Sequence, residues 1–535
     1  MAIEDDSNIE ALTAAQTPNW DILPAKGRLY IKVIEARNLW TPSMSHGAKD
    51  AAYAQSAARV KKPYCVVEFD KNEFVTREAL QTNILSPEAA ALAMKEESQY
   101  RNMGADEIQE TQGCWMSPVW KHEASFDVSQ PDSEVTISIW DRSDGSQEIF
   151  LGMLKIKPPM VNNGKVYDHW FKLMPRQWKE KVFGDVRIQL MYKSVETNSL
   201  CADDFTTLRV VGKGSFGKVV LVKKNNTGRV YAMKILSKKH IVQRQEVVHT
   251  LSERNVLIRT TASPFLVGMK FSFQTPEKLY LVLDYMNGGE LFYHLQRDTQ
   301  FSEEQSKFYT CELICGLEFL HKNRIIYRDL KPENVLLDSN GHVALTDFGL
   351  CKENMGPNDV TSTFCGTAAY LAPEVLKGEG YGMSVDWWSL GILFYEMATG
   401  LPPFYSENVN LMYKKILHNQ LLFPIGFSKE AESLVRALLD RNPLTRLGSG
   451  ANDASDIKKH SYFANVDWIC LEKKQLMPPF KPQVDSETDT TNFDPMFTDL
   501  PPDSLPNNSM PLSATFQEKF EGFSFQASVQ SIRLE

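Results

Sequence analysis

The sequence predicts an α+β fold in two parts, an antiparallel β-sandwich followed by a larger domain of strands and helices. Before residue 192, short segments alternate polar and apolar residues, and few helical patterns separate them. From Phe205 onward, a few strands give way to long apolar segments of helical length. The chain has 535 residues, which is too many for one domain of ordinary size.

Composition and charge narrow the class of protein before any motif is considered. Hydrophobic residues make up 43% of the chain and charged residues 23%, as in globular proteins. The net charge of −9 gives no general attraction to nucleic acid. No apolar run approaches membrane-spanning length, and the acidic start at Glu4, Asp5 and Asp6 is unlike a signal peptide. Any membrane contact is therefore expected to be peripheral.

The eight cysteines show no CxxC pair and no regular framework of disulfides. This usage indicates a reducing compartment, so we expect a cytoplasmic protein, with nuclear and transiently membrane-associated forms left open. Cys311 and Cys315 are one helical turn apart and could suggest a metal site, but no further His or Cys lies nearby at ligand spacing. Buried structural thiols are the favoured interpretation.

The first part of the chain is expected to begin with a flexible leader at 1–25, where no periodicity is present. The β-sandwich then spans 26–192, and its first strand is predicted at 27–36. Four further segments share the alternation of this strand: 64–69, 124–128, 135–140 and 186–192. An Ala/Glu/Gln-rich insertion at about 79–113 is expected to be helical or disordered.

Several phrases in this region resemble those of C2 domains. They are the segments 27–30, 36–39, 63–67, 117–120, and 140–141 followed by 150–152. Many C2 domains bind Ca²⁺ with a cluster of loop carboxylates, because Ca²⁺ requires many oxygen ligands. The resemblance implies an incomplete calcium site in this chain.

The calcium loops depart from the usual pattern at two places. The loop after residue 140 offers Asp141 and Asp144, but Ser143 stands where a second ligand is usual, and Asp50 is alone in the first loop. Three basic residues precede the second strand: Arg59, Lys61 and Lys62. They could contact anionic lipid or form an ordinary solvated face, so the expected membrane contact is weak.

A polar linker is predicted at 193–204, and a glycine-rich loop follows between two strands of the second domain. The loop consists of Gly212, Lys213, Gly214, Ser215, Phe216, Gly217, Lys218 and Val219. The GxGxxG pattern alone is weak evidence, because dinucleotide-binding folds share it. Here the last glycine leads into a β-branched strand rather than a helix, and the next strand carries Lys234. This order indicates a loop over nucleotide phosphates, with Lys234 paired to the α/β-phosphates.

A cluster of polar residues lies at 327–334 and continues at 347–349, between short apolar strands. One carboxylate there can receive a hydroxyl proton, and one ammonium can neutralise a transferring phosphate. An amide and a second carboxylate can hold Mg²⁺. Both segments resemble the catalytic loop and the metal-binding loop of protein kinases, with Tyr327 where many kinases have His. The implied fold is the bilobal protein-kinase fold over 205–463.

The resemblance assigns roles to individual residues of these loops. It implies that Asp329 receives the proton of the substrate hydroxyl and that Lys331 neutralises the phosphoryl group. It also implies that Asn334 and Asp347 bind Mg²⁺, so that ATP and Mg²⁺ are expected. Glu253, in a helix predicted at about 243–260, is the expected partner of Lys234.

The resemblance extends to the adenine pocket and the helical lobe. Backbone groups of Asp284 and Met286 are expected to bind adenine, and Glu290 is expected to face the ribose or a basic substrate residue. Helices at 306–321 and 386–399 are expected to form the core of the larger lobe.

Two peripheral segments resemble the AGC group of kinases, the activation segment around Thr363 and the tail at 464–535 with its hydrophobic motif. The resemblance implies activation by phosphate on Thr363 and Ser524, because added charge can order a loop. Cationic partners of the first phosphate are expected from Arg328, His249 and Lys352. Two aromatic rings of the hydrophobic motif are expected to enter a groove beside the predicted helix at 243–260.

The whole pattern is similar to the Akt / serum-and-glucocorticoid-regulated type, with a C2-like module that suggests a fungal relative. This similarity implies Arg at −5 and −3 of the target, bound by the acidic residues Glu290, Glu333 and Glu396. Ala368 and Ala369 stand where the group usually has Pro-Glu, at positions that shape the pocket for the residue after the phosphoacceptor. The tail also lacks the usual turn-motif phosphosite, so Ser504 and Ser509 are only candidates.

The predicted function is ATP-dependent phosphorylation of Ser/Thr in proteins, in growth or stress signalling, by a monomer under upstream kinases. Two hypotheses from other classes stay open. One is a pseudokinase scaffold, which a measurement of ATP turnover would exclude. The other is a lipid-binding adaptor dominated by the N-terminal module, which co-sedimentation with liposomes would test.

Overall fold

The computed structural model describes residues 27–39, 62–79, 117–128, 133–144, 147–160, 164–176, 180–194, 200–214, 217–356, 359–501 and 512–526. Apart from short segments, the chain divides into two compact units, 1–198 and 199–527. The predicted leader, nearly all of the predicted insertion, and the basic residues Arg59 and Lys61 lie outside the described residues. Within the described residues, no helix is long and apolar enough to span a bilayer.

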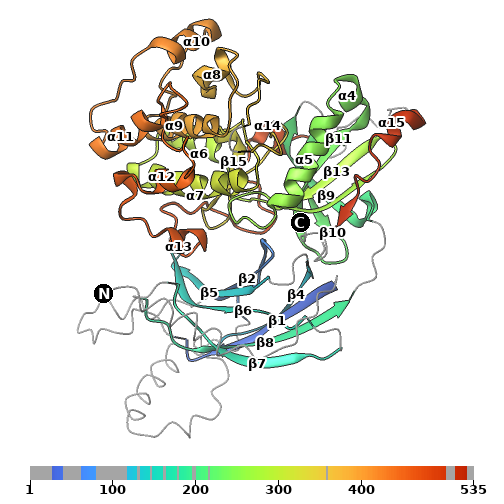
Figure 1. Ribbon diagram of the computed structural model, residues 1–535. Helices are drawn as coiled ribbons and strands as arrows, with labels where there is room; N and C mark the ends of the chain where they lie inside the picture. Colours follow the sequence, from blue (N-terminus) through green and yellow to red (C-terminus); the bar gives the residue numbers. More distant parts are fainter. Residues whose placement is uncertain are drawn as a thin grey trace, which may run out of the picture. The chain divides into compact units, whose positions relative to one another are not determined.

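The first unit is an antiparallel sandwich of two four-stranded sheets, as predicted (Figure 1). One sheet has the order β4-β1-β8-β7, with β1 (Gly27–Arg37), β4 (Val119–Val128), β7 (Tyr167–Lys172) and β8 (Asp185–Ser194). The other has the order β3-β2-β5-β6, with β2 (Pro63–Phe69), β3 (Asn72–Val75), β5 (Val135–Asp144) and β6 (Gln147–Ile156). Buried side chains from both sheets form one core, because each strand turns alternate residues inward.

Three strands of the sandwich, β3, β6 and β7, were not predicted, and β4 begins five residues before the predicted 124. The edge strand β7 shows why, since Phe171 is its only fully buried residue and Trp170 is exposed. A strand with so little of one face buried lacks the alternation on which the prediction depends.

Of the predicted calcium-loop residues, the structure describes the side chain of Asp141. The carboxylate of Asp141 is buried and accepts a hydrogen bond from the backbone N–H of Lys62 at 2.8 Å. The ammonium of Lys62 forms an exposed ion pair with Glu78 at 3.3 Å. Asp50 and the side chains of Ser143 and Asp144 lie outside the described residues. The incomplete calcium site therefore stays a prediction.

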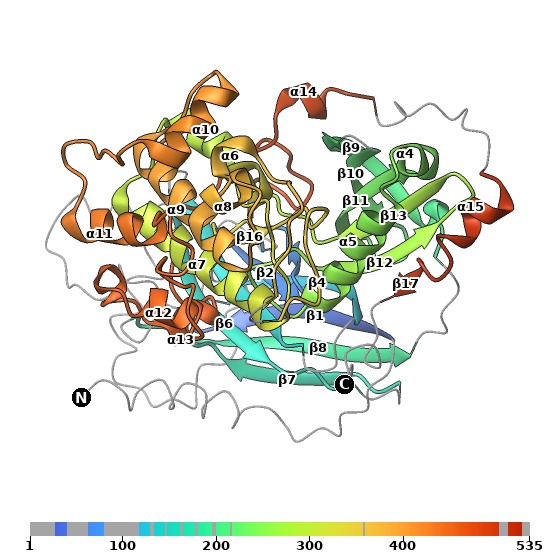
Figure 2. The ribbon, with the colours of Figure 1, turned by 45° about the horizontal axis from the view of Figure 1, so that its top comes forward.

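The smaller lobe of the second unit is a six-stranded antiparallel sheet with two helices (Figure 2). The sheet order is β17-β12-β13-β11-β10-β9. Its members are β9 (Phe205–Gly214), β10 (Gly217–Lys224), β11 (Val230–Ser237), β12 (Met269–Gln274), β13 (Lys278–Leu283) and β17 (Phe525–Gln526). The helices are α4 (Lys238–Gln243) and α5 (Val247–Thr260).

The helix predicted at about 243–260 is thus wrong at its start, since α5 begins at Val247. A break separates it from α4, because Gln245 adopts a left-handed backbone conformation with a φ of 60°. Such a conformation interrupts an α-helix, and the apolar periodicity of the sequence does not reveal it.

The larger lobe is mainly helical and contains the small sheet β14-β15-β16. Its strands are β14 (Gly289–Glu290), β15 (Val335–Leu337) and β16 (Val343–Leu345). Its helices are α6 (Leu291–Asp298), α7 (Glu303–Lys322), α8 (Pro373–Leu376), α9 (Ser384–Thr399), α10 (Val409–His418), α11 (Lys429–Leu438), α12 (Ala454–Lys458) and α13 (Trp468–Glu472). Trp387 and Trp388 of α9 are fully buried, which fits a packing role.

Helix α7 begins three residues before the predicted start at 306. Ser302 caps it: its hydroxyl accepts the N–H of Gln305, whose side chain accepts the N–H of Ser302. Cys311 and Cys315 on this helix are buried free thiols, and burial raises the pKa of Cys315 to about 12. The predicted burial of these two thiols is confirmed.

The described part of the C-terminal tail forms no separate domain and returns to the smaller lobe (Figure 2). It contributes α14 (Pro495–Thr498), which contacts β9, then α15 (Ala514–Glu518) and finally β17 at the edge of the sheet. The confirmed fold class is α+β, with the antiparallel sandwich preceding a two-lobed mixed unit.

Candidate active site

The glycine-rich loop is the hairpin between β9 and β10, where Gly214 pairs with Gly217 and Gly212 pairs with Val219. Val219 also pairs with Lys234 on β11, so these side chains share one face of the sheet. A Cβ on Gly217 would lie 1.7 Å from the carbonyl oxygen of Ile235, so only glycine fits there.

The other predicted residues of this loop differ in burial and in the strand to which they belong. Gly212, Lys213 and Gly214 end β9, with Lys213 exposed, and Lys218 is buried at the start of β10. The tip residues Ser215 and Phe216 lie outside the described residues.

Lys234 lies between two carboxylates. Its Nζ is 2.5 Å from Oε1 of Glu253 on α5 and 3.3 Å from Oδ1 of Asp347. The predicted contact between Lys234 and Glu253 is therefore present. Burial alone would lower the pKa of Lys234, but Asp347 and Glu253 outweigh burial and raise it. The positive charge of Lys234 in turn is the main cause that lowers the pKa of Asp347.

The catalytic-loop segment forms a compact network around Asp329. Its Oδ2 is 2.9 Å from Nζ of Lys331 and accepts the amide of Asn334 at 2.8 Å. Its Oδ1 accepts the hydroxyl of Thr367 at 2.9 Å, and Lys331 also donates to that hydroxyl at 3.1 Å. The carboxylate is thus held at both oxygens, so its direction is fixed.

Thr367 was not predicted as a site residue. It comes from the activation segment, far from the catalytic loop in sequence, and a hydroxyl in a loop has no distinctive pattern. The only available signal was its place in the motif that begins at Thr363.

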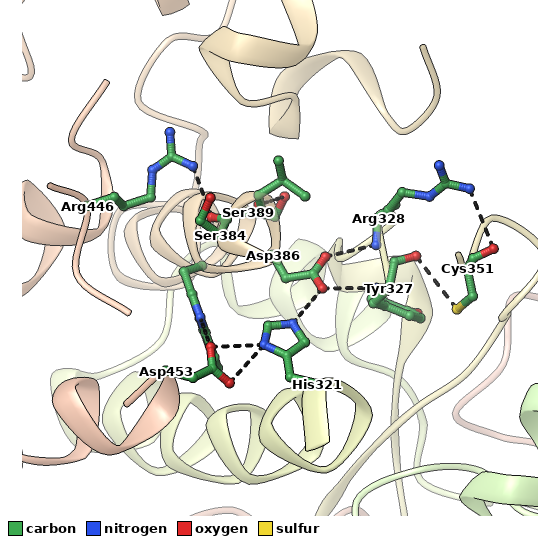
Figure 3. Close-up of polar contacts among 11 residues, drawn as sticks. His321, Tyr327, Arg328, Cys351, Ser384, Asp386, Ser389, Arg446 and Asp453 are labelled. Atoms are coloured by element: carbon green, nitrogen blue, oxygen red, sulfur yellow. Dashed lines mark hydrogen bonds and ion pairs between the residues drawn. The ribbon is translucent and has the colours of Figure 1, made fainter. Parts of the chain in front are cut away.

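The backbone of the catalytic loop is anchored by Asp386 at the start of α9 (Figure 3). The two carboxylate oxygens accept the backbone N–H groups of Tyr327 at 2.9 Å and Arg328 at 2.8 Å. Asp386 therefore anchors this loop at two consecutive backbone positions. Arg328 has a left-handed φ of 69°, a strained conformation that such anchoring can maintain.

Arg328 is connected to the activation segment through Tyr381. Its Nη1 donates to the Tyr381 hydroxyl at 3.2 Å, and this hydroxyl donates to the carbonyl of Thr363 at 2.6 Å. The Thr363 side chain itself is exposed. Among the described contacts, none joins the other two predicted partners, His249 and Lys352, to Thr363. The His249 ring is 2.5 Å from Glu246, and Lys352 is exposed.

Three glutamates, Glu290, Glu333 and Glu396, form an acidic group. Burial raises the pKa of Glu290 to about 7, and the charges of Glu333 and Asp494 act in the same direction. Burial also raises the pKa of Glu396 to about 7, again with a contribution from Glu333, and its carboxylate accepts the hydroxyl of Tyr370. Carboxylates that repel one another in this way favour a cationic ligand.

The segment after β13 lies where adenine binding was predicted. Asp284 is buried: its backbone N–H donates to the carbonyl of Gly268 at 3.0 Å, and its Oδ2 accepts the N–H of Gly268 at 2.9 Å. The Met286 side chain is buried as well, and its carbonyl accepts the N–H of Gly289 at 3.2 Å. These contacts fix the backbone that leads from β13 to Glu290.

The tail aromatics are docked on the smaller lobe. Phe520 and Phe523 are fully buried, and Phe525 is half-buried in β17. The carbonyl of Phe523 accepts Arg254 of α5 at 3.0 Å and Ser272 of β12 at 2.7 Å. The predicted entry of two rings beside α5 is therefore observed, although Arg254 was not predicted to take part.

The donor atoms at Asn334 and Asp347 suit a divalent cation. Asp347 supplies an ionised carboxylate with a lowered pKa, and Asn334 uses its amide N–H groups toward Asp329, so its oxygen remains an acceptor for a metal. Oxygen ligands of this kind match hard cations. In the part of the chain that the structure describes, no three His, Cys, Asp or Glu side chains form a metal cluster. Phosphate oxygens would have to complete the coordination.

Comparison with known families finds three matches. The protein kinase domain matches residues 205–463, the protein kinase C terminal domain matches 484–525, and the C2 domain matches 104–173. These matches cover part of the sandwich region, the two-lobed unit and part of the tail.

Relatives among characterised proteins extend over most of the chain. Serine/threonine-protein kinase gad8 of Schizosaccharomyces pombe is 45% identical over 527 residues, which is 94% of this chain and 85% of that protein. Serine/threonine-protein kinase SCH9 of Saccharomyces cerevisiae is 49% identical over 76% of this chain and 50% of that protein. A RAC family serine/threonine-protein kinase homolog of Dictyostelium discoideum is 53% identical over 62% of this chain and 73% of that protein.

Proposed function

Because the chain belongs to the AGC group of serine/threonine protein kinases and carries a C2 domain, we propose that it phosphorylates Ser/Thr preceded by Arg at −3 and −5. The observation that carries this proposal is the acidic group of Glu290, Glu333 and Glu396, in which two carboxyl pKa values are raised to about 7. A guanidinium would relieve this repulsion and bind two carboxylate oxygens at once.

The residues around Asp329 support in-line transfer of a phosphoryl group. Asp329 receives the proton of the substrate hydroxyl, and its direction is set by Thr367 and Asn334. Lys331 and Lys234 bring positive charge to the moving phosphoryl group and to the α/β-phosphates. Mg²⁺ held by Asn334 and Asp347 would neutralise phosphate charge when bound. The site therefore acts by positioning and charge neutralisation.

Peptide kinetics with Glu290→Gln test the arginine subsite. We expect the KM for an Arg-x-Arg-x-x-Ser peptide to rise about 30-fold at pH 8, because one charged hydrogen bond is lost. In the unaltered enzyme, KM should rise about tenfold between pH 8 and pH 6, because Glu290, with a pKa of about 7, becomes protonated and can no longer bind a cation. The variant should lose the part of this pH dependence that Glu290 contributes and keep the part that Glu396, also with a pKa of about 7, contributes.

Glu304→Gln on the exposed face of α7 is the matched control, and its KM should equal that of the unaltered enzyme. A peptide series in which both arginines can be removed without change in KM would contradict the arginine preference. Phosphorylation of the same peptides would still support the kinase activity itself.

We further propose activation by phosphorylation at Thr363 and Ser524. Both side chains are exposed, Thr363 is linked through Tyr381 to Arg328, and Ser524 lies between the two docked aromatics Phe523 and Phe525. A phosphate on Thr363 would add negative charge to a segment that already reaches the Arg328 guanidinium.

Phosphatase treatment should lower kcat by about 10- to 100-fold, with loss of phosphate at Thr363 and Ser524 seen by mass spectrometry. Thr363→Ala and Ser524→Ala should each reproduce part of this loss, because each removes one of the two ordering phosphates. The neighbouring exposed residue gives the control Ser362→Ala, which should behave as the unaltered enzyme. Full activity of enzyme that carries neither phosphate would exclude this form of regulation.

A further inference from the structure

His321, near the C-terminal end of α7, lies between two carboxylates in the interior of the larger lobe (Figure 3). Its Nε2 is 2.9 Å from Oδ2 of Asp386, and its Nδ1 is 3.0 Å from Oδ2 of Asp453. The side chain is 1% exposed. A neutral imidazole has only one N–H, so two carboxylate contacts require the doubly protonated, cationic ring.

The two carboxylates differ in what else they bind. Asp386 is fully buried, and its two oxygens also accept the backbone N–H groups of Tyr327 and Arg328. Asp453 lies just before α12 with a φ of 48°, is 28% exposed, and accepts the indole N–H of Trp387 at 2.7 Å. One side of His321 therefore leads to the catalytic loop, and the other side leads toward solvent.

These contacts form a continuous chain of charged hydrogen bonds from Asp453 through His321 and Asp386 to the backbone that precedes Asp329. We propose that Asp453 is a positioning residue for phosphoryl transfer, which keeps His321 cationic and thereby fixes Asp386 under the catalytic loop. The proposal rests on the role of Asp329 in the proposed function. Asp453 itself touches neither substrate nor nucleotide in this scheme.

The charge balance around His321 supports a cationic ring. Asp386 of α9 and Asp453 of the loop before α12 face it with negative charge, and Trp387 of α9 presents a ring at 4.9 Å between centroids. The catalytic loop contributes only neutral backbone N–H groups, through Asp386. On α7 itself, the adjacent Lys322 pairs with Glu318 at 3.0 Å.

Burial alone would lower the pKa of His321, but its hydrogen bonds to Asp386 and Asp453 outweigh burial and raise the pKa to about 9. The ring is therefore cationic throughout the usual assay range. Because its pKa is higher in the folded state than in the unfolded chain, protonated His321 stabilises the fold. This stabilisation is complete at a pH below the unfolded-state pKa of histidine and is lost as the pH rises through about 9. Loss of the Asp453 charge would move that decline to lower pH.

The test compares kcat of the full-length enzyme and of Asp453→Asn between about pH 6 and pH 9, the range in which histidine titrates. We expect a nearly constant kcat for the unaltered enzyme over most of this range. For Asp453→Asn, kcat should fall about tenfold toward the alkaline end and recover at the acid end, where His321 regains its proton. KM for ATP and for peptide should change less than about twofold, because Asp453 contacts neither.

The half-buried Asp456 of α12 gives the matched control. Its carboxylate accepts the amide of Asn452 at 3.0 Å and pairs with Lys459 at 3.8 Å, and neither contact leads to His321. Asp456→Asn should have the kcat and pH profile of the unaltered enzyme. Asp453→Ser is measured in parallel so that the result does not depend on the folding of one variant. Asp453→Glu, which retains the charge, should restore the flat profile.

A constant kcat for both neutral Asp453 variants at every pH would overturn the proposal, and so would an equal loss at every pH with a lowered Tm. The latter result would show that Asp453 only stabilises the fold. Activity of Asp329→Asn equal to that of the unaltered enzyme would instead refute the proposed function, so the two failures are distinguishable.

Discussion

Replacing Asp329 by asparagine should lower kcat about 1,000-fold, because the amide cannot accept the proton of the substrate hydroxyl. The amide is nearly the same size as the carboxylate and can still accept the hydroxyl of Thr367, so the loop should stay folded. ATP affinity should change little, because Asp329 is not placed at the nucleotide. Single-turnover phosphorylation of peptide and equilibrium binding of ATP measure the two quantities separately.

Asp298→Asn is the matched control, since Asp298 is exposed at the end of α6 and pairs only with its neighbour Arg297 at 2.8 Å among the described contacts. Its kcat should be unchanged. Asp347→Ala, in contrast, should weaken nucleotide binding as well as turnover, because it removes a carboxylate beside Lys234 and a proposed metal ligand. Unaltered turnover in both active-site variants would mean that the chemistry resides elsewhere.

Replacing Arg446 by methionine should reduce the free energy of unfolding of the larger lobe by about 3–5 kcal/mol. Arg446 and Glu374 are fully buried and form a bidentate ion pair with N–O distances of 2.7 and 2.8 Å. Methionine fills similar space but leaves Glu374 as an unpaired charge in the interior. Urea unfolding followed by tryptophan fluorescence reports this change, because Trp388 packs against the guanidinium.

The surface pair of Arg436 and Glu432 provides the comparison. Its N–O distance is also short, 2.6 Å, but its side chains are 48% and 36% exposed. Arg436→Met should therefore cost less than about 1 kcal/mol, because solvent already screens the charges. Equal losses for the two variants would show that burial does not determine the strength of these pairs here.

Site residues that lie at a fixed spacing from glycines and apolar strands were predictable from the sequence. Lys234 and Asp329 stand at set distances from glycines and apolar strands, and their side-chain types have few alternative uses at those positions. The sandwich was predictable for the same reason, because alternation in strands such as β1 is a strong local signal.

Several partners supplied by distant segments were not predicted. Thr367, Tyr381 and Asp453 act through contacts that only the folded chain creates, and none of them stands in a distinctive local pattern. The break before α5 depends on the backbone conformation of Gln245, which composition does not specify. Local signals predicted the candidate reacting groups and the partner Glu253, while the other groups that hold them required the tertiary structure.

The position of β17 has a consequence for shortened forms of the protein. Phe525 and Gln526 pair with β12, which would otherwise be the terminal strand of the sheet. Removal of the last segment would leave unpaired backbone N–H and C=O groups along β12, next to the apolar groove that holds Phe520 and Phe523. An exposed edge beside an apolar groove is a template for association between chains. Through β17, the tail therefore covers a strand edge that would otherwise be open to pairing with another chain.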